Sequence, residues 1–140
     1  MRDARRLSRP VVQTKRAYEA ADRSDGYRVL VDRLWPRGVR KDALALDAWA
    51  KELAPSDELR RWFGHDPRRW REFVERYRRE LRAPAARERL DDVARRAANG
   101  AVTVVYGARD ERHNDAVVIR GEIARRLRAR TGRAARRGAA

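Results

Sequence analysis

Ala101-Val102-Thr103-Val104-Val105-Tyr106 is the strongest secondary-structure signal in this chain of 140 residues. The run is almost continuously apolar and β-branched, which is typical of a strand buried on both faces of a parallel sheet. A similar run, Tyr27-Arg28-Val29-Leu30-Val31, follows the turn signal Asp25-Gly26. Helical patterns lie between the two runs and after the second, as in a βαβ unit. The sequence therefore predicts a parallel sheet flanked by helices.

The helices are predicted from apolar residues spaced three and four apart. One helix opens at Asp66-Pro67, where proline suits the first helical position. Pro84 precedes a second helix, which Asn99-Gly100 closes. A last helix is expected to begin within 110–113. The residues expected to face the core are Trp70, Phe73, Val74, Tyr77, Leu81, Leu90, Val93, Ala94, Ala97, Ala116, Ile119, Ile123 and Leu127.

These elements predict one small three-layer α/β domain, with a mainly parallel sheet of three to four strands, over residues 11–128. Residues 11–18 supply a first short strand. Residues 44–52 fit either a short strand or a helical turn. Residues 1–10 and 129–140 are expected to be basic, disordered tails.

The net charge of +15 is concentrated at the two ends of the chain. Residues 1–16 carry +5 and residues 125–140 carry +7, so the ends supply 12 of the 15 charges. Arginine outnumbers lysine by 33 to 3, which also fits compositional drift without selection for binding. A basic tail attracts nucleic acid mainly without regard to its sequence, so non-specific nucleic-acid binding through the tails is one open function.

The chain contains no cysteine, which excludes disulfides and thiolate chemistry within it and fits a reducing compartment. It has no run of about 18 apolar residues of the kind that crosses a membrane. We therefore expect a cytoplasmic protein with no membrane partner. No histidine or carboxylate spacing is typical of a metal site, so no metal is predicted, and neither the cofactor nor the oligomeric state can be derived.

Ligands of open α/β sheets bind beyond the carboxyl ends of the strands. Polar residues follow both predicted strands at 32–38 and 106–114, and His65-Asp66 lies between two helices. If the two strands are neighbours, these segments share one edge. The candidate ligand-binding residues are Arg33, Trp35, Arg37, Gly38, Trp62, Tyr77, Arg109 and Asn114, and the candidate catalytic residues are His65, Asp110 and His113.

Four motifs in order resemble those of the YeaO-like proteins, the group with domain of unknown function 488. They are Asp32-Arg33-Leu34-Trp35-Pro36-Arg37-Gly38, Glu52-Leu53-Ala54-Pro55-Ser56, Trp62-Phe63-Gly64-His65-Asp66 and Ala108-Arg109-Asp110-Glu111-Arg112-His113-Asn114. The resemblance spans about residues 13–127 and implies a small bacterial α/β protein without implying an activity. Related branches carry a cysteine near the last strand. Tyr106 and Gly107 occupy that region here, so cysteine chemistry does not carry over.

Each candidate residue also has a structural interpretation. Arg33 and Arg37 either clamp an anion through their planar guanidinium groups or reflect the abundance of arginine. His65 and His113 are either proton-transfer groups or surface and capping imidazoles, and Asp110 fits an N-cap. Whether the protein is an enzyme stays open. The functions left open are a domain that binds or converts a small anionic ligand, a nucleic-acid-associated protein, and a non-catalytic module for a protein partner.

Overall fold

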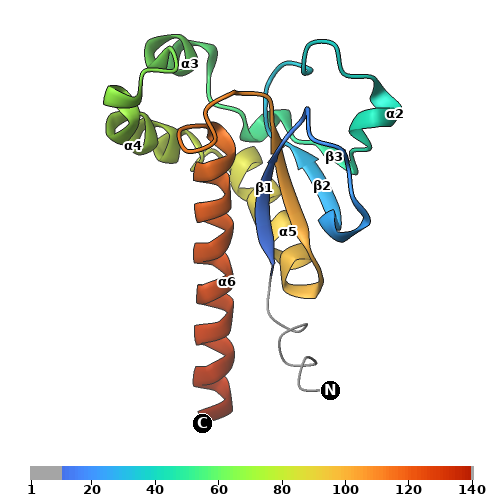
Figure 1. Ribbon diagram of the computed structural model, residues 1–140. Helices are drawn as coiled ribbons and strands as arrows, with labels where there is room; N and C mark the ends of the chain where they lie inside the picture. The colour runs from blue at the N-terminus through green and yellow to red at the C-terminus, as the bar shows by residue number, and fades with distance from the viewer. Residues whose placement is uncertain (1–10, 140) are drawn as a thin grey trace.

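A computed structural model describes residues 11–139, and Figure 1 shows its elements. The strands are β1 (Val12–Arg16), β2 (Tyr27–Leu30), β3 (Ala48–Trp49) and β4 (Val102–Tyr106). The α-helices are α2 (Lys41–Leu44), α3 (Asp57–Phe63), α4 (Trp70–Glu80), α5 (Pro84–Asn99) and α6 (Asp115–Ala139). The short 3-10 helices η1 (Arg23–Asp25), η2 (Lys51–Leu53) and η3 (Pro67–Arg69) lie between them.

The four strands form a parallel sheet in the order β1-β4-β2-β3. β4 lies in the middle, with Val102 opposite Val12 on one side and opposite Tyr27 on the other. All five of its residues are buried, so the prediction of a strand covered on both faces is confirmed. Because the strands are parallel, all four carboxyl ends meet at one edge, the upper edge in Figure 1.

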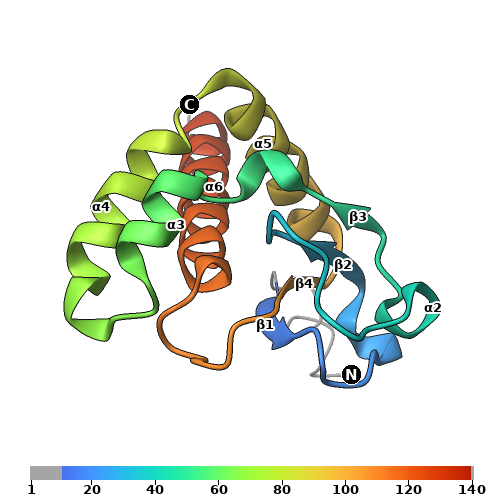
Figure 2. The same cartoon turned by 90° about the horizontal axis from the view of Figure 1, so that it is seen from above.

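The larger core lies between the sheet and the long helices. Seen from above in Figure 2, α4, α5 and α6 lie on one side of the sheet and α2 on the other. Val29 and Val104 point from the sheet into this core, where Tyr77, Leu90 and Ile119 are fully buried. The predicted α/β architecture and helix faces are confirmed. Burying side chains of this size stabilises the fold by about 1.5–3 kcal/mol each.

The opposite face of the sheet is covered by the segment from Trp35 to Trp49. Leu30 and Val105 pack there against Leu44, and the indoles of Trp35 and Trp49 meet edge to face at 5.4 Å between ring centroids. Both interpretations of residues 44–52 apply in part, because the helical turn α2 ends at Leu44 and the short strand β3 follows.

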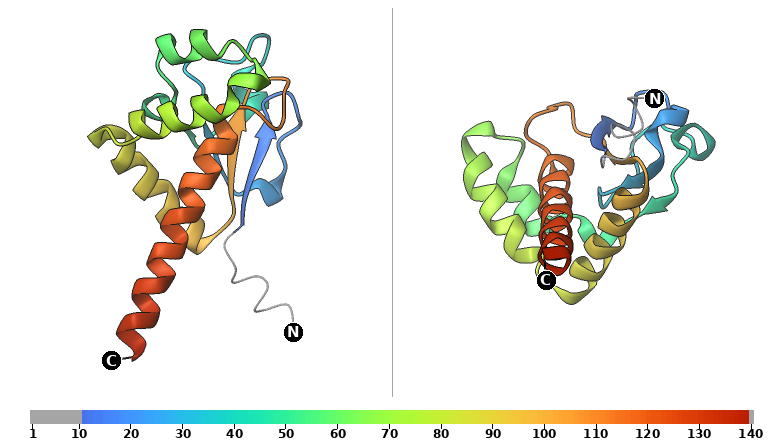
Figure 3. Two further views of the ribbon diagram at one scale, coloured as in Figure 1. Left: turned by 90° about the vertical axis from the view of Figure 1, so that its left-hand side faces the viewer. Right: turned by 90° about the horizontal axis from the view of Figure 1, so that it is seen from below.

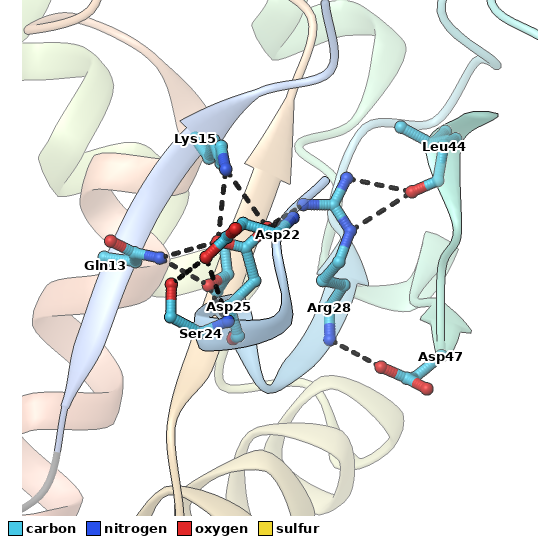
Figure 4. Close-up of polar contacts among 9 residues, drawn as sticks. Gln13, Lys15, Asp22, Ser24, Asp25, Arg28, Leu44 and Asp47 are labelled. Atoms are coloured by element: carbon cyan, nitrogen blue, oxygen red, sulfur yellow. Dashed lines mark hydrogen bonds and ion pairs between the residues drawn. The ribbon is translucent and has the colours of Figure 1, made fainter. Parts of the chain in front are cut away.

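A buried polar network occupies the rest of this face. Figure 4 shows Gln13 and Lys15 from β1 and Arg28 from β2 converging on Asp25. The Asp25 carboxylate lies 2.6 Å from Arg28 Nη1 and 3.2 Å from Lys15 Nζ, and it is 1% exposed. Burial alone raises the pKa of Asp25, but the Asp22 amide and the two cations outweigh it and hold that pKa below its ordinary value. Through Asp25, these hydrogen bonds and ion pairs connect β1 with β2.

The last helix differs from the prediction at both ends. It begins at Asp115 rather than within 110–113, and it continues to Ala139, so the prediction of a disordered C-terminal tail is wrong over 129–139. Alanine and arginine are strong helix formers, and they extend a helix whose first turns are anchored in the core. Figures 1 and 3 show this C-terminal part running clear of the sheet.

The predicted N-terminal tail, residues 1–10, lies outside the described residues, as does residue 140. Over the described range, none of the helices combines the length and the apolar character needed to cross a membrane.

Candidate functional site

A cavity of about 550 Å³ opens at the carboxyl edge of the sheet. Its walls come from the segment after β2, from α3 and the turn that follows it, from α4 and from the segment between β4 and α6. The predicted site residues Arg33, Trp35, Arg37, His65, His113 and Asn114 all line it. The structure therefore brings together residues from all four sequence motifs, since Pro55 of the second motif also lines the cavity.

The arginines at the cavity differ in their ion pairs. Arg33 Nε and Arg60 Nη2 lie 3.5 Å and 3.4 Å from the same Asp57 carboxylate oxygen. Within residues 11–139 the Arg37 guanidinium has no carboxylate within ion-pair distance, while the Tyr18 hydroxyl donates to the Arg37 carbonyl oxygen at 3.0 Å. The chain thus holds the Arg37 backbone in place and leaves its guanidinium available.

His113 is oriented by Asp110. Its Nδ1 lies 2.9 Å from Asp110 Oδ2, and its ring meets Trp70 edge to face at 5.2 Å. Hydrogen bonds from the His113 side chain and the Arg112 amide lower the pKa of Asp110. With Nδ1 facing Asp110, the other ring nitrogen of His113 is the one available to a ligand.

The N-cap of α6 is Asn114, whose Oδ1 accepts the Val117 amide at 3.1 Å. Asp110 caps the preceding turn instead, accepting the amides of Arg112 and His113 at 2.9 Å and 3.0 Å. The expectation that His113 lies in the first turn of a helix is therefore wrong. The five polar residues before Asp115 form a capped turn that aims His113 at the cavity.

His65 reaches the cavity through an unusual backbone. Gly64 and His65 both adopt left-handed conformations, with φ values of 54° and 57°. A non-glycine residue rarely takes this conformation, and it costs about 1–2 kcal/mol. Strain of this kind is often found at functional sites, although Ala45 at the end of α2 also has a positive φ of 47° and lies outside the cavity lining.

Several predicted site residues do not line the cavity. Tyr77 is fully buried and donates its hydroxyl to the Leu53 carbonyl oxygen, so it belongs to the core. Burial, with smaller contributions from Asp115 and Asp32, raises the pKa of Tyr77 well above its ordinary value. The Trp62 ring packs under the guanidinium groups of Arg69 and Arg76.

Gly38 and Arg109 are exposed outside the cavity. Gly38 occupies a turn with φ of 77° and has nothing within 4 Å of where a Cβ would lie. Asp110 contacts His113 without forming part of the cavity wall. These residues were proposed from proximity in sequence, which does not report the direction of a side chain.

The sequence analysis missed two acidic residues that do line the cavity. Asp32 Oδ2 accepts the Gly107 amide at 2.8 Å, which joins the ends of β2 and β4. Burial, followed by the charge of the neighbouring Asp32 carboxylate, raises the pKa of Asp115 well above its ordinary value. Asp32 could have been found as the polar residue that closes a buried parallel run. For Asp115, the sequence pattern indicated only an acidic residue at the start of a helix and not a place in the cavity wall.

Among the other lining residues that were not candidates, Tyr18, Phe63 and Phe73 supply aromatic walls and Arg60 supplies a further cation. Over residues 11–139, no three histidine, aspartate or glutamate side chains gather as metal ligands would.

Comparison with known proteins identifies the family. Residues 11–139 match the family described as the inactive DUF488-N3 subclade. The chain is 44% identical over 109 residues to Uncharacterized protein YeaO of Escherichia coli, covering 77% of this chain and 92% of that protein. It is 43% identical over 108 residues to an uncharacterized protein of Mycobacterium tuberculosis, covering 77% and 89% respectively. No solved structure matches it at a significant level. The chain belongs to the YeaO-like DUF488 family, in the branch described as the inactive DUF488-N3 subclade.

Proposed function

We propose that this chain binds a small anionic ligand in the cavity at the carboxyl edge of the sheet. The observation that carries the proposal is the gathering of five basic side chains around one cavity, Arg33, Arg37, Arg60, His65 and His113. The location agrees with the general rule that open parallel sheets bind ligands at this edge. The volume of about 550 Å³ fits a metabolite-sized molecule.

Arg37 is the principal anion contact in this proposal. Asp57 partly neutralises Arg33 and Arg60, whereas Arg37 keeps its full charge and five N–H donors. A planar guanidinium suits a phosphate or carboxylate, which it binds through two parallel hydrogen bonds. The rings of Trp35, Phe63 and Phe73 add apolar walls, which favour a ligand that also carries a ring or another apolar part.

Binding without catalysis has two supports. The subclade is described as inactive, and the chain has no cysteine to act as a nucleophile. The catalytic alternative uses His113, oriented by Asp110, or His65 to move a proton on the bound ligand. That alternative predicts turnover of a ligand once one is known, which the binding proposal does not require.

The test is a thermal-shift and calorimetric screen of the full chain against phosphate, phosphorylated metabolites, nucleotides and carboxylates, with Arg37→Ala in parallel. A charge-assisted hydrogen bond contributes about 1.5–3 kcal/mol, so the variant should bind at least about tenfold more weakly while keeping its melting temperature. Arg79→Ala on the exposed side of α4 is the matched control and should bind like the parent. If no anion binds, or if Arg37→Ala binds as the parent does, the proposal is wrong.

A second candidate function is binding of nucleic-acid phosphates along α6. Arg126, Arg130, Arg133 and Arg137 are spaced four, three and four residues apart, which places them on one helix face. Arg95 joins the first three around a hollow of about 420 Å³ between α5 and α6. After Leu127 the helix has no acid and no large apolar residue, which favours a polyanion over a membrane surface.

Replacing these four α6 arginines with glutamine keeps helix propensity and removes the charge. The slope of log affinity against log salt for a DNA duplex should become shallower by up to about 3.6, since each of the four phosphate contacts contributes about 0.9. The control replaces four exposed arginines elsewhere, Arg71, Arg79, Arg82 and Arg87. Equal slopes for the two variants would remove the case for α6.

A further inference from the structure

Asp32 and Asp115 form a carboxyl pair in the wall of the candidate cavity. Asp32 follows β2 directly after Val31, and Asp115 is the first residue of α6. The Gly107 amide donates to Asp32 Oδ2 at 2.8 Å, and both carboxyl side chains line the same cavity, close enough for the Asp32 charge to raise the pKa of Asp115. Three segments that are distant in sequence therefore place two acidic groups side by side.

The chain does not neutralise this pair. It contains 36 lysines and arginines, yet within residues 11–139 neither carboxyl lies within 4 Å of a cationic nitrogen. Asp25 recruits both Lys15 and Arg28 to one carboxylate. The contrast matters because two carboxyls in contact repel when both are ionised, so a fold under selection for stability alone would pair or remove them.

The cavity consequently presents both signs of charge to a ligand. Arg33 and Arg37 lie on the segment after β2, and His65 and His113 lie on two further walls. The acid pair is on the same surface, and Gly107 lines the cavity beside it. A ligand that carried only negative charge would meet repulsion at this part of the wall.

On the basis of the anion-binding function proposed above, we infer that the ligand is zwitterionic, with an ammonium group that Asp32 and Asp115 receive while Arg37 holds the anion. An ammonium group is compact, carries three N–H donors and can contact both carboxyl groups at once. A hydroxyl supplies one donor and leaves the charge of the pair uncompensated.

Binding of a ligand at this pair changes how many protons the two carboxyl groups hold. The ammonium group stabilises the ionised form of both carboxyl groups, so binding releases a proton to solvent wherever the pair holds one. A hydroxyl-bearing ligand brings no charge to the pair and releases no proton. Proton release thus distinguishes the two ligand chemistries independently of affinity.

The experiment compares isosteric ligand pairs on the full chain by isothermal titration calorimetry. One series consists of ω-amino carboxylates and phosphates with two to five carbons, and the other of the matching ω-hydroxy compounds. At one chain length or more, the amino member should bind at least tenfold more tightly. Its apparent enthalpy should vary with the ionisation enthalpy of the buffer in the direction of proton release, whereas that of the hydroxy member should not.

The variants separate the acid pair from the rest of the site. Asp115→Asn should abolish the tenfold preference and the proton release while retaining affinity for the hydroxy compounds. Asp92→Asn on α5, where Asp92 pairs with Arg95 and Arg96 away from the cavity, should keep both. Because Asp115→Asn is expected to fold at least as stably as the parent, loss of preference would not be a consequence of unfolding.

The outcomes separate the two proposals. If hydroxy and amino members bind equally in the parent, or if Asp115→Asn keeps the preference, the zwitterion inference is wrong and anion binding stands. If neither series nor any simple anion binds, both are wrong. If Mg²⁺ or Ca²⁺ alone raises the melting temperature of the parent but not that of Asp115→Asn, the pair serves a metal ion and the ammonium assignment is overturned.

Discussion

Two groups of aspartates lie near the sheet, and they differ in their charged neighbours and in the direction of their pKa shifts. Asp25, on the face covered by α2, is surrounded by Gln13, Lys15 and Arg28, and its pKa is lowered. Asp115, at the carboxyl edge, faces another carboxyl group, and its pKa is raised. The first group is buried and electrostatically satisfied, whereas the second lines a cavity and is not.

This difference distinguishes buried polar groups that stabilise the fold from polar groups that face a cavity. A satisfied buried network contributes to stability and to strand register, since its groups are already paired. A carboxyl pair without a cation at a cavity costs stability, and the ammonium group proposed above would supply the missing positive charge. Aspartate content alone does not distinguish the two cases, because Asp25 and Asp32 flank the same strand and nothing in the local sequence shows which of them meets a cation.

Removing the Asp25 charge should give the largest effect on stability. Asp25→Asn leaves Lys15 and Arg28 without their shared counter-ion, and breaking a buried ion pair costs about 3–5 kcal/mol. Urea unfolding of the variant and of the exposed control Asp42→Asn measures the loss. A change as small as that of the control would mean that the network does not stabilise the fold.

The same network predicts acid sensitivity. Because the folded-state pKa of Asp25 lies below the ordinary value of 3.8, its contribution is present above that pH and is lost as pH falls through the folded pKa. The free energy of unfolding of the parent should therefore drop more steeply below about pH 4 than that of Asp25→Asn.

Asp115→Asn should act in the opposite direction, with a smaller effect. The folded-state pKa of Asp115 is raised, so its contribution is full below the ordinary value of 3.8 and is lost as pH rises through the folded pKa. Removing the repulsion should stabilise the protein by about 1 kcal/mol at pH 8, with a gain that shrinks as pH falls. Unfolding curves at pH 8, 6 and 4 test this. A variant less stable than the parent at pH 8 would show that the pair is structural.

The smallest effect on stability is expected from a substitution that crowds the Asp32 carboxylate. A Cβ on Gly107 would lie 3.1 Å from Asp32 Oδ2, so Gly107→Ala should displace that carboxylate and lower stability by about 1 kcal/mol. Gly100→Ala is the matched control, because nothing lies within 4 Å of its Cβ position and its backbone is extended. Equal melting temperatures for the two variants would show that the Asp32 contact tolerates displacement.

The periodic spacing of hydrophobic residues was sufficient to predict the strands and helices that form the core. The runs at 27–31 and 101–106 and the stripe from Phe73 to Leu81 each bury a face that the local pattern defines, and all three lie where they were predicted. The βαβ order predicted a parallel sheet, and the structure shows that β2 and β4 are neighbours in it, which the sequence left as a condition. Six predicted site residues also meet at one cavity because they follow strands or lie between helices.

The local sequence pattern did not predict which way individual side chains point or which charged groups form pairs. Tyr77 and Trp62 were proposed as site residues from their position near the motifs, but one points into the core and the other packs under arginines. The C-terminal residues 129–139 were expected to be disordered from their charge, although their helix propensity continues α6.

The sequence by itself determined the fold class and the edge of the sheet at which the candidate site was expected, because these depend on hydrophobic period and chain connectivity. Only the tertiary structure decided which charges meet. Asp25 with Lys15 and Arg28, and Asp32 with Asp115, are contacts between segments that are separated along the chain or joined by a turn. An electrostatic interaction depends on distance and burial in space, and neither is encoded in the local pattern of residues.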